Sequence, residues 1–305
     1  MNKSYIIKEI YSGMRIDRWI RNNIASLPQS LIEKSLRKGK IKINIKKVNS
    51  SYKLKTGDKI NFFNFTFDVN KRNEANKKFS PSLKLLKIHE NRILENNDDF
   101  IVIDKSPGVP VQGGTKSKKN LIDILASSEF FRDTKPFPVH RLDKETSGIM
   151  IISKNHNSAR LLTTLFRLRK IHKTYLAICH GNISKKKGEL KNELMTFENN
   201  KKKIEKAITY YKVLSETDSM SFLELKPVTG RKHQLRKQLA LIDNPIVGDK
   251  KYILSNKKIK SDKDLMLHAY SLKFYINDKK FFYKADPPPA FSKYLNKKKL
   301  NILNF

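Results

Sequence analysis

Cysteine is nearly absent from this sequence, because Cys179 is the only one among 305 residues. A single thiol cannot form an internal disulfide, and it cannot supply the several thiolates of a cysteine-rich zinc site. Cys179 stands in an apolar, strand-like run, so we expect it to be a small core side chain. Cysteine usage therefore gives no indication of an oxidising compartment.

Long apolar runs are also missing. No stretch approaches the ~20 apolar residues of a membrane-spanning helix, and residues 1–10 lack the apolar segment of a secretory signal peptide. We therefore expect a soluble, cytoplasmic protein that does not associate with membranes. A length of 305 residues fits about two domains whose cores need no metal or disulfide.

Acidic residues are the third shortage. The chain has 29 Asp and Glu residues against 64 Lys and Arg residues, which gives a formal net charge of +35. Part of this excess fits a general richness in Lys, Asn and Ile. A charge of this size attracts polyanions such as RNA, DNA or an anionic membrane surface. Compositional drift could have enriched the acidic residues as well as the lysines, and it did not. We therefore favour a polyanionic partner over compositional drift alone.

The first 70 residues have the pattern of a small α/β module. Apolar residues recur at helical spacing over 15–21, and a second short helix is predicted over 31–38, with Gly39 ending it. Two segments of alternating polarity, 41–44 and 59–62, predict short strands. The sequence therefore predicts two helices followed by a basic hairpin.

This arrangement resembles the S4 RNA-binding domain over residues 13–62. The resemblance implies that the module binds RNA through cationic side chains that contact phosphates. The side chains that we assign to this face are Arg15, Arg18, Arg37, Lys38, Lys40 and Lys42. From the charges alone, the solvated side of an ordinary helix pair explains them equally well.

Residues 71–90 predict a linker, because the stretch through Lys78 is polar and without a hydrophobic period, and Ser80-Pro81-Ser82 follows it. A larger domain then spans residues 91–305. We predict its strands at 100–104, 149–152, 174–179, 208–214, 222–225 and 266–274, and its helices at 121–126, 158–170 and 231–241. Strands and helices do not alternate strictly, which favours an α+β fold on a mostly antiparallel mixed sheet over a doubly wound parallel sheet.

Three stretches of the larger domain combine polar side chains with apolar strands, a pattern typical of a functional site. They are residues 140–152, which begin His140-Arg141-Leu142-Asp143 and run through Thr-Ser-Gly into a strand, residues 173–178 with Tyr175, and residues 225–236 with Arg231 and Arg236.

These stretches resemble the RluA family of pseudouridine synthases, and the match extends over nearly all of residues 92–291. It includes the segments at 244–249, 267–269 and 287–289. With the S4-like module in front, the chain is most similar to the RluC type, whose members modify large-subunit ribosomal RNA. The resemblance implies a pseudouridine synthase catalytic domain that acts on RNA, with 23S ribosomal RNA or a large-subunit precursor as the expected partner. We expect a monomer without an obligate protein partner.

The resemblance implies a role for each matching residue. Asp143 falls on the family's essential aspartate nucleophile, and Arg236 falls on the arginine that pairs with it. Tyr175 falls on the tyrosine that packs against the target base and assists proton removal. Arg141 matches the arginine that helps to hold the flipped-out nucleotide, and Arg231 is assigned as a further RNA contact.

The implied reaction breaks the N1–C1′ bond of uridine and joins C5 to C1′. Because it is an isomerisation, we expect no cofactor and no metal. An ionised carboxylate suffices as nucleophile or electrostatic stabiliser, and a nearby arginine favours its charged form. Attack at C1′ and attack at C6 both remain open. The base must leave its stack, which costs a few kcal/mol, and stacking on an aromatic ring returns ~1–3 kcal/mol.

The same residues are also compatible with different functions. An aspartate beside an arginine is more often a structural ion pair, and the charge fits a non-catalytic RNA-binding factor in ribosome assembly equally well. A glycosidase shares the chemistry at C1′, but it normally needs a second carboxylate. A metal triad of His140, His233 and His268 is disfavoured, since no carboxylate or cysteine stands at ligand spacing.

Overall fold

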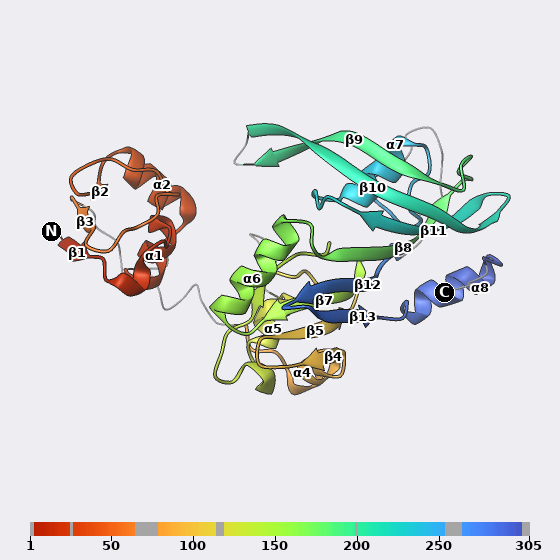
Figure 1. The fold of residues 1–305 in the computed structure, drawn as a ribbon, viewed down its shortest axis with the longest axis horizontal. Helices are drawn as coiled ribbons and strands as arrows, with labels where there is room; N and C mark the ends of the chain where they lie inside the picture. Colours follow the sequence, from red (N-terminus) through yellow and green to blue (C-terminus); the bar gives the residue numbers. More distant parts are fainter. Residues whose placement is uncertain are drawn as a thin grey trace. The chain divides into compact units, whose positions relative to one another are not determined.

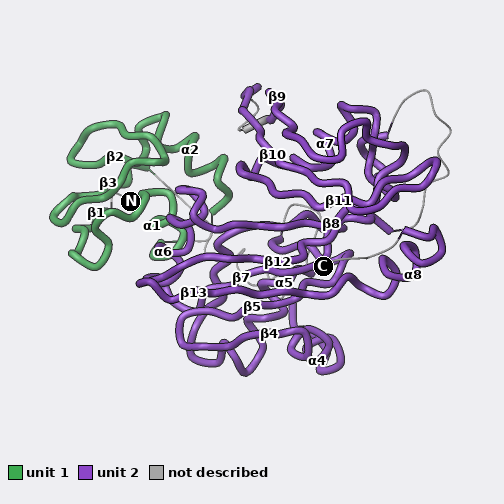
Figure 2. Tube along the Cα trace, turned by 45° about the vertical axis from the view of Figure 1, so that its right-hand side comes forward, with its two compact units in different colours: residues 1–78 green, residues 79–305 purple. Residues whose placement is uncertain are grey.

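The computed structural model describes residues 3–24, 27–64, 79–113, 119–198, 201–253 and 264–300. The chain divides into two compact units, residues 1–78 and 79–305 (Figure 2). This division differs from the predicted linker at 71–90, because helix α4 (Leu83–Glu90) belongs to the second unit. The Ser-Pro-Ser sequence that indicated a loop contains the helix cap, since Ser82 Oγ accepts a hydrogen bond from Leu85 N at 3.3 Å. Residues 71–78 lie outside the described ranges.

The first unit packs two helices against a small sheet. Its elements are β1 (Lys3–Ile6), a 3₁₀ turn (Glu9–Tyr11), α1 (Ile16–Asn23), α2 (Gln29–Arg37), β2 (Ile41–Ile43) and β3 (Lys59–Phe62), and the antiparallel sheet has the order β1-β3-β2. The two predicted helices and the two predicted strands are confirmed. Strand β1 was not predicted, because its side chains are mostly exposed and carry no apolar alternation.

Helix α2 ends as the glycine indicated. Gly39 has a φ of +72°, and its N–H donates to Leu36 O while Lys40 N donates to Ser35 O. This pair of hydrogen bonds satisfies carbonyl groups at the helix end in the way that a left-handed glycine permits. In α1, Ile16, Trp19 and Ile20 recur at helical spacing and are buried in the core of the unit.

The second unit is built on a ten-stranded sheet (Figure 1). The strand order is β4 (Ile93–Asn96), β5 (Phe100–Lys105), β7 (Ser147–Ser153), β12 (Leu267–Ile276), β8 (His172–His180), β11 (Met220–Pro227), β10 (Lys201–Thr217) and β9 (Lys187–Glu198), with β6 (Phe137–Pro138) beside β7 and β13 (Lys279–Lys284) beside β12. Among the described strands, every pairing is antiparallel except that of β7 with β12. The predicted α+β fold on a mostly antiparallel mixed sheet is confirmed.

Helices cover both faces of this sheet. They are α5 (Leu121–Leu125), α6 (His156–Arg167), α7 (Gln234–Leu241) and α8 (Pro289–Lys297), with a 3₁₀ turn at Glu129–Phe131. Alternate residues of β7 enter different cores: Ile149 and Ile151 pack with Leu162 of α6, whereas Met150 and Ile152 pack with α5. Two buried faces explain why residues 149–152 of β7 are all apolar instead of alternating. In the described part of the chain, none of the helices combines the length and apolarity needed to cross a bilayer.

Strand β12, at the centre of the sheet, separates the segment that carries Asp143 from the strand that carries Tyr175. Ala269 of β12 lies opposite Gly148 of β7 on one side and opposite Tyr175 of β8 on the other. Gly148 has a φ of +109°, and a Cβ atom on it would stand 2.2 Å from Ala269 O. Glycine is therefore required where the segment carrying Asp143 joins the sheet, by conformation and by close approach.

We predict that Gly148→Ala destabilises the second unit by roughly 3 kcal/mol or more, because strain and a backbone clash act together. The matched control is Gly108→Ala, at a φ of +84° with nothing within 4 Å of the added Cβ. Strain alone should cost that variant about 1–2 kcal/mol. Urea unfolding of both variants checks this. Equal destabilisation would show that the close approach to Ala269 adds no cost beyond the backbone strain.

Candidate active site

A cavity of about 950 Å³ opens in the second unit. The three stretches singled out in the sequence meet in it, because residues 139–144, Lys173, Tyr175 and residues 227–236 line its wall. Asp143, Tyr175 and Arg236 all line this one cavity. Segments that are distant in the chain thus converge on one place, as the resemblance implied.

Asp143 is held by the backbone of its own loop. Thr146 N donates to Asp143 O at 3.2 Å, and Gly108 N donates to Lys144 O at 2.8 Å. The buried ammonium of Lys105 also donates to Lys144 O, at 3.1 Å, and to Ser106 O and Val109 O. Burial lowers the pKa of Lys105 to about 8. The loop that presents Asp143 is therefore fixed at Asp143 and at the residue that follows it.

Arg236 bridges two carboxylates, and Asp143 is the more distant of them. Its Nε and Nη2 donate to Asp249 Oδ2 and Oδ1, both at 2.7 Å, whereas Nη1 reaches Asp143 Oδ2 at 3.4 Å. The Arg236 and Asp249 side chains are only 7% and 1% exposed. The predicted pairing of Arg236 with Asp143 exists, but the bidentate partner is Asp249, which the sequence had marked only as part of a matching segment.

Asp249 stays ionised despite its burial. Burial favours the neutral acid, but hydrogen bonds from Arg236 and from the backbone N–H groups of Lys251 and Tyr252 leave the pKa of Asp249 below its ordinary value. For Arg236, burial opposes the charged form, and the two carboxylates raise its pKa above the ordinary value. The guanidinium is therefore permanently charged and fixed in orientation.

His233 is a site residue that the sequence did not assign to this reaction. Its Nε2 lies 3.6 Å from Asp143 Oδ1, and its Nδ1 lies 2.8 Å from the Tyr252 hydroxyl. Burial lowers the pKa of His233, although Asp143 opposes this. The predicted helix at 231–241 begins only at Gln234, because His233 has a left-handed φ of +55°. The three-residue spacing from Arg236 was the one signal that could have placed His233 beside Asp143.

Tyr175 presents its side chain from β8 to the cavity. Burial, and to a lesser degree the charge of Asp143, raise the pKa of Tyr175 above its ordinary range. The phenol is therefore neutral at neutral pH. Its ring offers an aromatic surface for a base, and any part in proton removal would begin from the protonated hydroxyl.

The two arginines assigned to RNA differ in their surroundings. Arg141 lines the cavity, is exposed, and makes no ion pair with any described residue. Arg231 also lines the cavity, but its Nη1 donates to Glu205 at 2.8 Å and its Nε donates to Lys206 O at 3.2 Å. Arg231 thus ties the segment before α7 to strand β10, and part of its hydrogen-bonding capacity is already used.

His140 and His268 serve as neutral scaffold. His140 Nε2 accepts a hydrogen bond from Ile151 N at 3.0 Å, and burial lowers its pKa to about 3. His268 Nε2 donates to Ala285 O at 2.9 Å, Ser147 Oγ lies 2.9 Å from its Nδ1, and burial lowers its pKa to about 4. Within the described ranges, no three His, Cys, Asp or Glu side chains are grouped to hold a metal ion.

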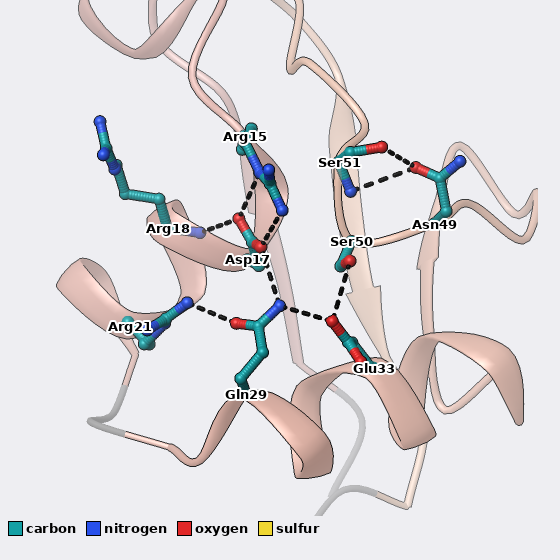
Figure 3. Close-up of polar contacts among 9 residues, drawn as sticks. All are labelled: Arg15, Asp17, Arg18, Arg21, Gln29, Glu33, Asn49, Ser50 and Ser51. Atoms are coloured by element: carbon teal, nitrogen blue, oxygen red, sulfur yellow. Dashed lines mark hydrogen bonds and ion pairs between the residues drawn. The ribbon is translucent and has the colours of Figure 1, made fainter. Parts of the chain in front are cut away.

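The basic residues predicted to form the RNA-binding face of the first unit are exposed except Lys42, which is half-buried, and they are not equally free. Arg15 donates to Asp17 at 3.1 and 2.6 Å, and Gln29 donates to the same carboxylate at 3.0 Å (Figure 3). The Arg18 side chain extends away from this cluster (Figure 3). Arg37, Lys38 and Lys40 are exposed at and beyond the end of α2. Asp17 thus neutralises part of the predicted basic face, and the role of this face in RNA binding stays a prediction.

Comparisons with known proteins agree with this site. Residues 99–241 match the family described as RNA pseudouridylate synthase. The ribosomal large subunit pseudouridine synthase C of Rickettsia conorii is 36% identical over 270 residues, which cover 85% of this chain and 88% of that protein. The protein of the same name from Vibrio parahaemolyticus is 30% identical over 286 residues, covering 88% and 87%.

Solved structures show the same architecture. The human RNA pseudouridylate synthase domain containing 4 superposes with a TM-score of 0.64 at 27% identity, covering 72% of this chain and 98% of that one. The human RNA pseudouridylate synthase domain containing 1, at 23% identity and a TM-score of 0.56, shares the fold over 70% of this chain and 89% of its own.

The lowered pKa of the neutral histidines predicts stability that falls in acid. Folding lowers the pKa of His140 to about 3 from an ordinary value of 6.5, so the unfolded chain binds the proton first. The stabilising effect is complete above pH 6.5 and is lost as the pH falls toward the folded value. We expect His140 to account for a drop of about 2 kcal/mol in the free energy of unfolding between pH 7 and pH 5.

Urea unfolding across this pH range, on the native chain and on His140→Gln, measures that share. The variant lacks one titrating ring and should show a shallower pH dependence by about one proton. Identical slopes would mean that folding leaves the pKa of His140 unchanged.

Proposed function

The chain belongs to the RNA pseudouridylate synthase family, and from this premise we propose that it isomerises selected uridines of large-subunit ribosomal RNA. As a member of the family it is an RNA isomerase. The choice of 23S ribosomal RNA or its precursor is supported by the name of the relatives, which are ribosomal large subunit enzymes. The proposal includes a cytoplasmic monomer that works without a cofactor, and a first unit that binds RNA through its basic residues.

One observation carries the assignment of chemistry to Asp143. Among the described residues that line the cavity, Asp143 is the only acidic one, and it is surrounded by arginines and lysines. A carboxylate in a cavity for RNA repels phosphates, so a protein that only binds RNA gains nothing from it. A nucleophile for the reacting nucleotide requires it. This contrast favours the enzyme over the non-catalytic assembly factor.

The geometry suggests how the residues divide the work. Arg236, held by Asp249, faces Asp143 Oδ2, while His233 lies beside Oδ1. The Asp143 side chain is 25% exposed, so one face of the carboxylate stays open to a substrate. A flipped-out uracil would pack against Tyr175, and Arg141 at the exposed rim would hold the displaced backbone.

We predict that Asp143→Asn lowers pseudouridine formation in an unmodified 23S ribosomal RNA transcript by at least about a thousandfold. RNA affinity and folding should be retained, because the amide has the size of the carboxylate. The matched control is Asp133→Asn, which removes an exposed carboxylate outside the cavity and should leave the rate unchanged. Site-resolved pseudouridine mapping of the transcript measures both, and full activity in Asp143→Asn would refute the assignment.

A further inference from the structure

Lys173 stands in the cavity wall and has no part in the chemistry described above. It precedes Tyr175 by two residues in β8, so both side chains lie on the same face of the strand, about 7 Å apart. Both line the cavity. A base packed on Tyr175 would therefore bring its own sugar–phosphate backbone into the neighbourhood of Lys173.

The ammonium group of Lys173 lacks an anionic partner within the described part of the chain. Lys173 is half-buried, and no ion pair or hydrogen bond satisfies it there. Burial, and then the nearby cation of Arg169, lower the pKa of Lys173 to about 8. A half-buried cation next to a second cation is unfavourable unless an anion joins them. A negatively charged group of a ligand would therefore stabilise Lys173 in these surroundings.

Gly230 leaves space in front of this ammonium group. A Cβ atom on Gly230 would meet only Lys173 Nζ, at 3.9 Å, and its φ lies outside the left-handed region. Neither the backbone conformation nor packing within the protein therefore requires glycine at this position. Glycine is also used where the backbone of a ligand must approach closely. The bare backbone of residue 230 and the ammonium of Lys173 together border an open part of the cavity.

We propose that Lys173 binds a phosphodiester group of the substrate RNA directly beside the target uridine, in the space that Gly230 leaves open. This assignment rests on the proposed function and deepens it. The RNA backbone supplies a phosphate on each side of the target nucleotide, and an ammonium group with three donors suits a single phosphate. Arg169, two residues beyond the end of α6, adds positive charge. Lys173 would thereby offset the repulsion that Asp143 exerts on the backbone.

A double-mutant cycle tests the contact. A short substrate RNA is made with a neutral methylphosphonate linkage on the 5′ or the 3′ side of the target uridine, and compared with the native RNA. In the native enzyme one of the two neutral linkages should lower kcat/KM by roughly 10- to 100-fold, as expected for a charge-assisted hydrogen bond. Lys173→Gln should lose a similar factor on native RNA, and should lose nothing further with that neutral linkage.

Lys293→Gln is the matched control, because it removes an exposed lysine of α8 outside the cavity. It should behave as the native enzyme on all three RNAs. Equal losses from the neutral linkages in the native enzyme and in Lys173→Gln would overturn the proposal, as would a native kcat/KM for Lys173→Gln on native RNA.

Gly230→Ala provides a second variant that does not remove charge. Its thermal unfolding should match that of the native protein, since the added methyl meets no backbone. Its kcat/KM on native RNA should fall at least severalfold, because the methyl occupies the place of the phosphate. A native kcat/KM for a normally folded Gly230→Ala would contradict the assignment of this space.

The failure of this proposal differs from a failure of the proposed function. If the native enzyme forms pseudouridine but the cycle is additive, only the phosphate contact is wrong. If no pseudouridine forms, the same cycle measured by equilibrium binding of the three RNAs still decides whether Lys173 contacts a flanking phosphate. Coupling in binding without turnover would retain the contact and reject the reaction.

Discussion

The buried pair of Arg236 and Asp249 is the interaction on which the rest of the site depends. Asp249 takes two of the donors of the guanidinium at 2.7 Å and leaves Nη1 to face Asp143 at 3.4 Å. If Arg236 had Asp143 as its only anion, a bidentate pair would form with the nucleophile and cover both of its oxygens. Because Asp249 occupies Nε and Nη2, Arg236 contacts Asp143 through Nη1 alone, and part of the Asp143 carboxylate stays open.

The sheet supplies the second constraint, because it sets where the two sides of the cavity stand. Ala269 of β12 lies between Gly148 and Tyr175, so the Asp143 loop and the tyrosine enter from strands on either side of β12. The only parallel pairing among the described strands occurs here, and it brings β7 so close to β12 that a side chain at 148 would clash. Two neutral histidines then hold these strands by hydrogen bonds: the half-buried His140 bonds to Ile151, and the buried His268 bonds to Ser147 and Ala285.

The sequence predicted those parts of the fold whose signal is local. Strand β7 has a continuous apolar run, and α2 has a glycine at its end, so both were found. Strands β9 and β13 were missed, because their sequences are polar or lysine-rich and their stability comes from their partners in the sheet. Helix α4 was missed because its short sequence follows a polar stretch and Ser80-Pro81-Ser82, which together indicated a linker. The residues of the site came from the resemblance, since Asp143 and Arg236 are 93 positions apart and no local pattern joins them. The roles of Asp249 and His233 appeared only once the chain was folded.

The reactivity of Asp143 thus depends on the orientation that Asp249 gives to Arg236, and one measurement tests this most directly. The single-turnover rate of pseudouridine formation at saturating RNA is compared between the native enzyme and Asp249→Asn, a variant of equal size that does not touch the reacting carboxylate. We predict that the rate falls by about ten- to a hundredfold, the range found when a supporting hydrogen-bond partner is lost, with RNA affinity unchanged. A native rate in Asp249→Asn would contradict this dependence.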